Sequence, residues 1–343
     1  AVGNLSQPVE AWGEIYTGIS AKDYMDGTSN FYGVHSVTLY VDSVEVFRSV
    51  TDRVLPDENR MINGFTDYEE LTRTRRLIMR SYKLPGNRLR LLHPNENRGA
   101  VTIDEERDYH FRYVLEDNFG NRRTYQFIVK GKRQDIPEYK PEANEMLYWN
   151  RTNVIQKPGM ELVVPRYYVY EDVPLRTDMR GDSSHIAFDY ILDAGRTPIH
   201  SYCDLSIGLR HMPVADTTKY YIVQKAGKWR SSMGGKYASG WIKTRVRSLG
   251  TFSVDVDTIA PQITPIGQGG WRTSRNIRFR IKDMESGIGS YKVYIDGKFV
   301  LFGLKKGILV IQDPEKVKKG VSHKLEVTVT DQCGNMTRKE YKF

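Results

Sequence analysis

Seven histidines occur in this sequence of 343 residues, and two of them stand four residues before an aspartate, at His185 to Asp189 and His200 to Asp204. That spacing can supply two ligands to a catalytic zinc ion, which also needs a third ligand and a base. Neither His-x-His nor His-Glu-x-x-His occurs. His185 and Asp189 fall on an expected strand, where positions i and i+4 lie about 13 Å apart. We therefore expect ordinary surface or core-edge histidines and no metal ligands.

The remaining nucleophilic side chains stand outside any catalytic motif. Ser231 and Ser232 are not part of a G-x-S-x-G sequence, which places the nucleophile of many hydrolases on a sharp turn. The two cysteines, Cys203 and Cys333, fall in different expected domains. They cannot build a disulfide framework or a cysteine-based zinc site, so we expect both to be free and buried. These residues predict neither enzymatic activity nor a cofactor in this chain.

A basic segment occupies residues 73–90 and contains no acidic residue. Such a segment could bind an anionic polymer through charge and counterion release. A nucleic-acid module would interleave stacking aromatics, and only Tyr82 intervenes here, so nucleic acid is not an expected partner. The alternative is a solvated rim neutralised by nearby acids such as Asp67, Glu69 and Glu70. The candidate residues for anion binding are Arg73, Arg75, Arg76, Arg80, Lys83, Arg88 and Arg90.

Carboxylates form a third group that could do chemistry. Asp23, Asp26, Asp283 and Glu285 stand at the edges of expected domains and could hold calcium between them, since hard cations prefer oxygen ligands. No complete D-x-[DN]-x-[DN]-G loop occurs. Turn and cap roles are therefore the favoured interpretation, and we expect no bound metal.

Aromatic side chains could stack on sugar rings. Tryptophans of β-sandwiches lie mostly in the core, so core packing is the favoured interpretation and carbohydrate binding is the alternative. The candidates are Trp12, Trp149, Trp229, Trp241 and Trp271, together with Tyr167, Tyr168 and Tyr170.

Short apolar/polar alternations separated by turns dominate the sequence, which is typical of antiparallel sandwiches. The clearest hairpin is expected at residues 37–47 around Asp42-Ser43. A second is expected at residues 291–301 around Asp296-Gly297, a dipeptide suited to a type I′ turn. The two hairpins indicate an internal repeat.

Downstream of each hairpin, a D-x-x-G-N turn leads into a final strand, at Asp117 to Asn121 in one copy and Asp331 to Asn335 in the other. An immunoglobulin-like sandwich ends in such a hairpin. We therefore predict one strand topology for both copies, with Leu39 and Val293 facing inwards in each.

The first copy is about 40 residues longer between these landmarks, and we place the insertion at about residues 48–100. In it, residues 66–69 form a capping-box pattern that predicts a short helix from Thr66 to about Arg76. The apolar spacing predicts that Leu71, Leu77 or Ile78 packs against the first domain and that Arg73, Arg76 and Arg80 are exposed.

A third, more irregular unit lies between the two copies, with strands expected at residues 167–170, 186–191, 220–223, 240–246 and 251–256. The expected fold class is all-β, with three tandem immunoglobulin-like β-sandwich domains of which the first carries a helical, basic insertion. The expected domains are residues 1–131, 132–257 and 258–343.

The composition agrees with ordinary folded domains. Hydrophobic residues make up 39% and charged residues 27%, and the formal net charge is +9. No apolar run approaches the roughly 18 residues that a membrane span requires. Residues 1–8 lack a basic start and an apolar core, so we expect that any signal peptide has been removed or lies upstream.

Several segments together resemble the region that follows the catalytic domain in cell-envelope zinc metalloendopeptidases of the lysostaphin/LytM type, metallopeptidase family twenty-three. The resemblance extends over nearly the whole chain and implies an exported periplasmic or cell-surface protein of a Gram-negative envelope. The segments are Ala21 to Gly27, Asn30 to Val34, Asp104 to Tyr109, Asp257 to Pro261, Ser286 to Lys298 and Thr330 to Asn335.

In that family the catalytic domain cleaves peptide cross-links of peptidoglycan with a His, an H-x-x-x-D and an H-x-H motif. None of these ligands can be carried onto this chain, because His185 and His200 fall in the middle sandwich. The resemblance therefore implies non-catalytic accessory or targeting domains, with zinc only in an upstream peptidase domain. Expected partners are that domain and peptidoglycan or another anionic envelope polymer. The alternative is a cell-surface adhesin or glycan-binding module without a peptidase domain.

Overall fold

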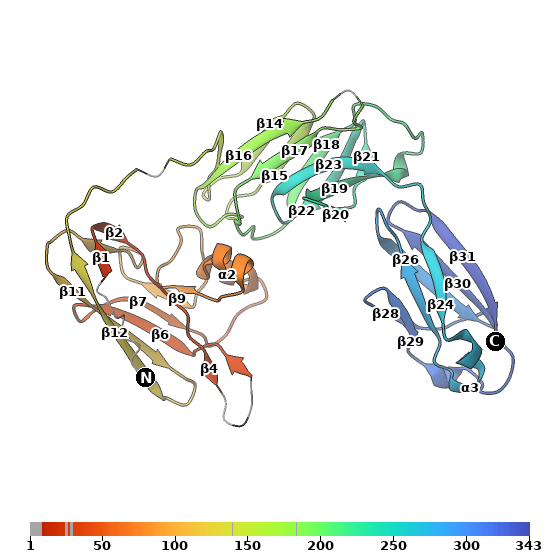
Figure 1. Ribbon diagram of the computed structural model, residues 1–343, viewed down its shortest axis with the longest axis horizontal. Coiled ribbons are helices and arrows are strands. Elements are labelled where there is room, and N and C mark those ends of the chain that lie inside the picture. The colour runs from red at the N-terminus through yellow and green to blue at the C-terminus, as the bar shows by residue number, and fades with distance from the viewer. Residues whose placement is uncertain (1–8, 25–26, 28–29, 139, 183) are drawn as a thin grey trace.

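The structure is a computed structural model that describes residues 9–24, 27, 30–138, 140–182 and 184–343. Figure 1 shows three β-rich bodies that follow one another along the chain, coloured red to yellow, green and blue. Three large groups of buried apolar side chains correspond to these bodies. The chain is therefore an all-β protein of tandem immunoglobulin-like sandwiches, as the alternating pattern predicts.

The first sandwich contains a six-stranded sheet in the order β1-β12-β11-β6-β7-β9. Its inward positions alternate along each strand, so that Leu39 and Phe111 are almost completely buried. Its strands are β1 (Val9–Ala11), β2 (Gly13–Ile15), β3 (Gly18–Ile19), β4 (Asp23–Tyr24), β5 (Phe31–Tyr32), β6 (Ser36–Val41), β7 (Val44–Val50), β8 (Met79–Arg80), β9 (Leu92–Pro94), β10 (Val101–Ile103), β11 (Asp108–Glu116) and β12 (Arg122–Gly131).

The insertion between β7 and β9 carries η1 (Asn59–Met61), α1 (Ile62–Phe65) and α2 (Tyr68–Thr74). The N-cap of α2 is Asp67, whose carboxylate accepts a hydrogen bond from the Glu70 N–H at 3.1 Å, so the predicted cap at Thr66 is wrong. Asp67 is favoured over Thr66 as the N-cap because its carboxylate carries a negative charge, which a helix N-terminus stabilises. No side chain of α2 itself is buried. None of the helices among the described residues is long and apolar enough to cross a membrane.

The middle sandwich packs a six-stranded sheet against a five-stranded sheet. Residues 167–170, expected as a strand, instead form a turn in which Tyr167 has a φ of 67°. The elements are β13 (Glu145–Leu147), β14 (Asn153–Lys157), β15 (Met160–Val164), β16 (Val173–Arg180), β17 (Asp189–Asp193), β18 (Cys203–Gly208), η2 (Thr217–Lys219), β19 (Tyr220–Ala226), β20 (Trp229–Ser232), β21 (Lys236–Ala238), β22 (Trp241–Val246) and β23 (Gly250–Val256).

The third sandwich has two four-stranded sheets, β24-β25-β29-β28 and β27-β26-β30-β31. Trp271 is fully buried between them and donates its indole N–H to the Ile266 carbonyl at 3.0 Å. The elements are β24 (Gln262–Ile266), η3 (Gln268–Gly270), α3 (Trp271–Ser274), β25 (Arg278–Lys282), β26 (Ile288–Ile295), β27 (Lys298–Phe299), β28 (Phe302–Lys305), β29 (Ile308–Ile311), η4 (Pro314–Lys316), β30 (Lys324–Asp331) and β31 (Met336–Lys342).

The first and third sandwiches repeat the same strand register. Leu39 pairs with Tyr113 in one, and Val293 pairs with Val327 at the equivalent place in the other. Leu39 and Val293 are both buried, which confirms the prediction that they share an inward face.

The two D-x-x-G-N turns have the same internal hydrogen bonds. Asp117 Oδ1 accepts from the N–H groups of residues 119 and 121 at 2.8 and 2.9 Å. Asp331 Oδ1 accepts from the equivalent N–H groups of residues 333 and 335, both at 2.8 Å. In both turns the asparagine amide also donates to the second aspartate oxygen. The turn is thus satisfied by its own groups in each copy.

Candidate functional site

One tyrosine of the middle sandwich is buried in the first. Tyr170 is 3% exposed and belongs to the apolar core of the first sandwich. Its hydroxyl donates to the Arg60 carbonyl at 2.8 Å, and its own carbonyl accepts from the Gly86 N–H at 2.6 Å. Burial raises the pKa of the Tyr170 hydroxyl well above its usual range. A Cβ at residue 64 would lie only 2.7 Å from the ring, so Gly64 is the residue that admits it.

The Tyr170 contact holds the two sandwiches against each other and leaves a cleft of about 620 Å³ between the insertion and the edge of the middle sandwich. We call it the interdomain cleft. Figure 1 shows α2 and the neighbouring loop of the first sandwich facing the β16 side of the second. The lining residues that bear polar or aromatic groups are Asn63, Tyr68, Glu69, Arg80, Glu142, Tyr170, Glu171, Asp172, Arg176, Asp193, Arg196 and Thr197.

Two ion pairs stand in the wall of the interdomain cleft. Arg80 Nη1 lies 3.7 Å from Glu171 Oε1, across the joint, and Arg176 Nη2 lies 3.3 Å from Asp193 Oδ2. The Nε of Arg80 is buried and has no hydrogen-bond partner among the described residues. The wall of the cleft thus presents guanidinium donors next to carboxylate acceptors. One guanidinium N–H, that of Arg80 Nε, lacks an acceptor among the described residues.

The structure scatters the candidate anion-binding residues. Arg73, Arg75 and Arg76 are exposed, at the end of α2 and beyond it, and Arg73 is paired with Glu70. Arg80 is only 18% exposed along its side chain and pairs with Glu171, so its predicted exposure is wrong. Its position on the short strand β8 turns it towards the joint.

The other three candidates have partners of their own. Burial lowers the pKa of Lys83, whose amine donates to the Leu89 carbonyl at 3.2 Å. The guanidinium of Arg88 lies 4.7 Å from the ring centre of Tyr167, in the middle sandwich. Arg90 donates two hydrogen bonds to Glu58, and these hold the pKa of that carboxyl near 2.

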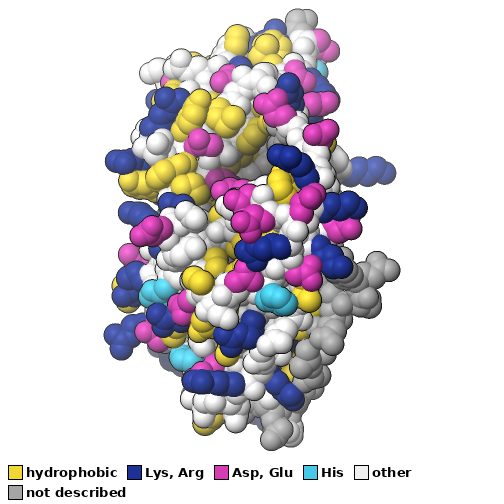
Figure 2. Space-filling model, turned by 90° about the vertical axis from the view of Figure 1, so that its left-hand side faces the viewer, with side chains coloured by type: hydrophobic (Ala, Val, Ile, Leu, Met, Phe, Trp, Pro, Cys, Tyr) yellow, Lys and Arg dark blue, Asp and Glu magenta, His cyan; other side chains and the backbone are white. Residues whose placement is uncertain are grey.

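The surface charge is correspondingly mixed. Figure 2 shows Lys and Arg side chains interspersed with Asp and Glu over the face that it displays. The seven candidates are therefore not a uniform set of unpaired surface cations, because paired and partly buried cations stand among the exposed ones.

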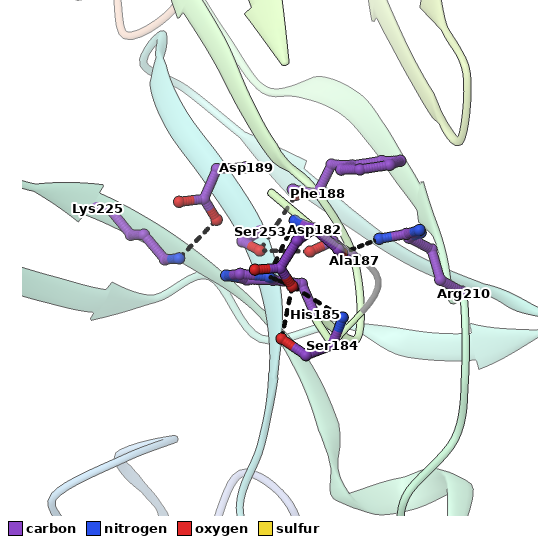
Figure 3. Close-up of polar contacts among 9 residues, drawn as sticks. All are labelled: Asp182, Ser184, His185, Ala187, Phe188, Asp189, Arg210, Lys225 and Ser253. Atoms are coloured by element: carbon purple, nitrogen blue, oxygen red, sulfur yellow. Dashed lines mark hydrogen bonds and ion pairs between the residues drawn. The ribbon is translucent and has the colours of Figure 1, made fainter. Parts of the chain in front are cut away.

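The histidines of the two His-x-x-x-Asp spacings contact other partners than the aspartates four residues on. His185 Nδ1 contacts Asp182 Oδ1 at 3.0 Å, whereas Asp189 Oδ1 accepts from Lys225 at 2.6 Å (Figure 3). His200 Nδ1 lies 3.0 Å from the Tyr170 hydroxyl, and its pKa is lowered, mainly by burial. Each of these side chains serves a local contact.

A separate carboxylate cluster lies where the middle sandwich joins the third. One oxygen each of Asp257, Asp283 and Asp331 lies within 4.8 Å of the others, a donor set that could hold a divalent cation. Asp257 is fully buried, and burial raises the pKa of Asp331. Ser286 donates to Asp257 and Asn335 to Asp331, so protein donors also satisfy these carboxylates.

Of the described residues in the predicted calcium set, only Asp283 belongs to this carboxylate cluster. Asp283 is a member, whereas Glu285 accepts a hydrogen bond from the Tyr221 hydroxyl at 3.3 Å. Asp23 lies in β4 of the first sandwich, and Asp26 lies outside the described residues.

The tryptophans differ in burial, since Trp12, Trp149 and Trp241 are partly buried and only Trp271 is fully buried among the five. Trp271 is in the core, and Trp229 is 81% exposed on β20, away from the interdomain cleft. Both cysteines are free and buried, as predicted. Burial raises the pKa of Cys203 to about 12 and that of Cys333 to about 11. These thiols are therefore neutral at physiological pH.

Sequence reasoning missed the acidic side of the cleft and the role of Tyr170. Glu142 comes from the linker and Asp172 from the turn before β16, and nothing in the local pattern indicates that they line the same cleft as Glu69. Tyr170 could have been found from Gly64 and Gly86, two glycines inside an insertion, which signal the close approach of another chain segment.

Comparisons with known proteins locate one family match. Residues 144–257 match the Zu5-like domain, and no curated protein matches the chain. A solved Ca²⁺-stabilized adhesin with which an Antarctic bacterium binds ice aligns at 10% identity over 97% of this chain and 94% of that chain, with a TM-score of 0.18. Drosophila N-cadherin EC1-4 aligns at 11% identity over 99% and 73%, also with a TM-score of 0.18. Values this low establish neither a shared arrangement nor a shared function.

Proposed function

We propose that this chain is a non-catalytic binding module of an exported cell-surface protein, of the adhesin or glycan-binding kind, and that the interdomain cleft is its ligand site. The observation that carries the proposal is the cleft of about 620 Å³ between two sandwiches. Ligand sites occur preferentially at domain interfaces, where two walls can be shaped independently. The buried Tyr170 fixes the walls before a ligand arrives, which lowers the entropic cost of binding.

The lining suits a ligand rich in hydroxyl groups. The Arg80–Glu171 and Arg176–Asp193 pairs each present donors and acceptors side by side, which can bond the two sides of a hydroxyl. The aromatic ring of Tyr68 offers an apolar face for the C–H side of a sugar ring.

Three features support a non-catalytic role. His185 and Asp189 bond to different partners, the cysteines are buried thiols, and Ser184 bonds to Asp182 rather than to a histidine. A serine or cysteine nucleophile is typically activated by a histidine within hydrogen-bond reach, and neither Ser184 nor the two cysteines bond to a histidine among the described residues.

The proposal is tested by sedimentation with insoluble polymers. Purified peptidoglycan, chitin and cellulose are incubated with the chain, and bound protein is measured. The variant Glu69→Trp places an indole at an exposed helical position in the lining and should block the cleft. The matched control Glu96→Trp changes an exposed glutamate outside the lining. Equal loss of binding in both variants, or no loss in Glu69→Trp, would exclude the cleft as the site.

The same assay separates this reading from the accessory role in a peptidoglycan endopeptidase. That role rests on the sequence resemblance alone, and it predicts retention on peptidoglycan but not on chitin or cellulose. Binding to several glycans would favour the adhesin or glycan-binding reading.

A further inference from the structure

We infer that the joint between the first two sandwiches is a pH-sensitive contact, which opens when the imidazole of His200 gains a proton. The joint is closed by Tyr170 of the middle sandwich, which enters the core of the first. His200 stands on the middle-sandwich side of that contact, where its Nδ1 lies 3.0 Å from the Tyr170 hydroxyl. The inference concerns the chain without a ligand, so it does not depend on the function of the interdomain cleft.

The hydrogen bonds of the Tyr170 hydroxyl define the neutral form of the ring. The hydroxyl has one proton, which it donates to the Arg60 carbonyl at 2.8 Å. Its oxygen can therefore accept from His200 Nδ1, and all three groups are satisfied when Nδ1 carries the proton of the neutral imidazole. A further proton must then bind to Nε2. That proton adds a positive charge to the joint without adding a bond to Tyr170.

Among the described residues, the charged side chains that act on His200 come from the first sandwich, and cations prevail. Arg60 crosses the joint, since its Nη2 donates to the carbonyl of Ile199, the residue before His200, at 3.0 Å. Its Nε is buried and finds no hydrogen-bond partner in the part of the chain that the structure describes. The charged and titratable groups that face His200 are Arg60, Arg88, Asp57, Tyr168 and Tyr170.

His200 differs in this respect from two other histidines. The rings of His185 and His323 contact the carboxylates of Asp182 and Asp296, at 3.0 and 2.6 Å. Burial, and after it the two guanidinium groups of the joint, lower the pKa of His200, while one exposed carboxylate opposes them. A proton on this ring is therefore unfavourable in the closed joint, because a buried charge loses its water and like charges repel.

The direction of the pH dependence follows from the protons that each state binds. In the open joint His200 is in water and takes up a proton near about pH 6.5, whereas in the closed joint it does so only at a lower pH. The open state binds more protons between these two values, so the joint should be most stable above pH 6.5 and weaken as the pH falls. One proton corresponds to a factor of up to about ten per pH unit in the opening equilibrium.

Hydrogen exchange of one backbone amide reports on the joint directly. The Gly86 N–H donates to the Tyr170 carbonyl at 2.6 Å across the joint, so its protection factor measures the opening equilibrium. We expect this factor to fall about three- to tenfold between pH 7.5 and 5.5, after correction for the intrinsic exchange rate. The Val50 N–H donates to the Leu91 carbonyl at 3.0 Å within the first sandwich and should keep its protection. The pH range lies above that in which ordinary carboxyl groups titrate, about pH 4.

Variants of the full chain test the residues. His200→Gln keeps an amide that can donate to the Tyr170 hydroxyl but cannot titrate, so it should abolish the pH dependence of Gly86 protection. The matched control His185→Gln changes a histidine of the middle sandwich that bonds elsewhere, and it should retain that dependence. Arg88→Gln removes a repelling cation and should reduce the fall about twofold.

A protection factor of Gly86 that stays constant from pH 7.5 to 5.5 would overturn the inference, as would a fall that persists in His200→Gln. An equal fall at Val50 would mean that the first sandwich loosens as a whole, which also contradicts it. If His200→Gln does not fold, Asp57→Asn provides the opposite charge change to Arg88→Gln and should enlarge the fall. A joint that does not respond to the charge of His200 would show no shift in either variant.

Opening of the joint would have a consequence for the interdomain cleft. The cleft lies between the same two sandwiches, so its two walls would separate as the pH falls.

Discussion

Replacing Tyr170 with alanine should separate the first sandwich from the second. The side chain is 3% exposed and packs into the core of a neighbouring domain, against Gly64 and Gly86. Removing a buried aromatic ring leaves a cavity and typically costs about 3–5 kcal/mol. The cost falls on the joint and on the insertion, because the Arg60 carbonyl loses its donor and the backbone bond from the Gly86 N–H loses the ring that packs beside it.

The substitution Tyr170→Phe isolates the hydroxyl. It keeps the ring but leaves the Arg60 carbonyl without its donor, which should cost about 1–3 kcal/mol. Tyr291→Phe is the matched control, because its hydroxyl also donates to a backbone carbonyl, that of Phe302 at 3.2 Å, but within the third sandwich.

Urea unfolding and small-angle X-ray scattering measure the two consequences. With an m-value of about 2 kcal/mol/M, the alanine variant should lower the unfolding midpoint of the first sandwich by about 2 M. Scattering should show a larger maximum dimension as the joint opens. Unchanged scattering with an unchanged first transition in Tyr170→Ala would refute the reasoning, as would an equal effect of Tyr291→Phe on the joint.

Three further outcomes are expected. His323 Nδ1 lies 2.6 Å from Asp296 Oδ2, and its Nε2 lies 2.7 Å from the Lys318 carbonyl. Burial lowers the pKa of His323, but these two bonds outweigh burial and raise the pKa above 6.5. The third sandwich should therefore be most stable below pH 6.5 and lose stability as the pH rises through the raised pKa, and Asp296→Asn should abolish that slope in pH-dependent melting. Trp271→Ala should cost about 3–5 kcal/mol in a denaturant titration of the third sandwich. Asn335→Ala should cost about 1 kcal/mol or more, because its amide bonds to the Asp257 carbonyl across the second joint at 3.0 Å; an unchanged midpoint would count against that bond.

The strands were predictable where local alternation and turn chemistry agree. The hairpin at Asp296-Gly297 and the register that places Val293 inwards follow from period-two patterning, which is a local property. The turn at Tyr167 to Tyr170 was mistaken for a strand because four aromatic and β-branched residues have strand propensity. Its burial depends on a partner about 100 residues away, and tertiary packing overrides propensity at such places.

The site was less predictable than the fold. Arg80 and Arg90 read as free cations in the sequence, since their acidic partners Glu171 and Glu58 lie in other segments. The carboxylate cluster at Asp257 likewise depends on three segments far apart in the sequence, those after β23, after β25 and at the end of β30. Charge pairing across domains leaves no periodic signal, so composition alone overstates how basic the functional surface is.

The D-x-x-G-N turn that precedes the last strand of both repeated sandwiches has the same backbone shape in two different surroundings. Its aspartate and asparagine side chains make the same bonds within the turn in both copies, and the side chain of the third residue takes no part in these bonds. That residue is Phe119, 92% exposed, at the end of the first sandwich, and Cys333, 3% exposed, where the third meets the second. At the second joint, the amine of Lys219 in the middle sandwich donates a hydrogen bond to the Cys333 carbonyl at 3.0 Å. This bond uses a backbone atom, so it does not depend on which side chain residue 333 carries. Joining another module at such a turn therefore requires an apolar third residue and an apolar surface to receive it, as Cys333 has in Tyr221 and Val223, while the bonds within the turn stay the same.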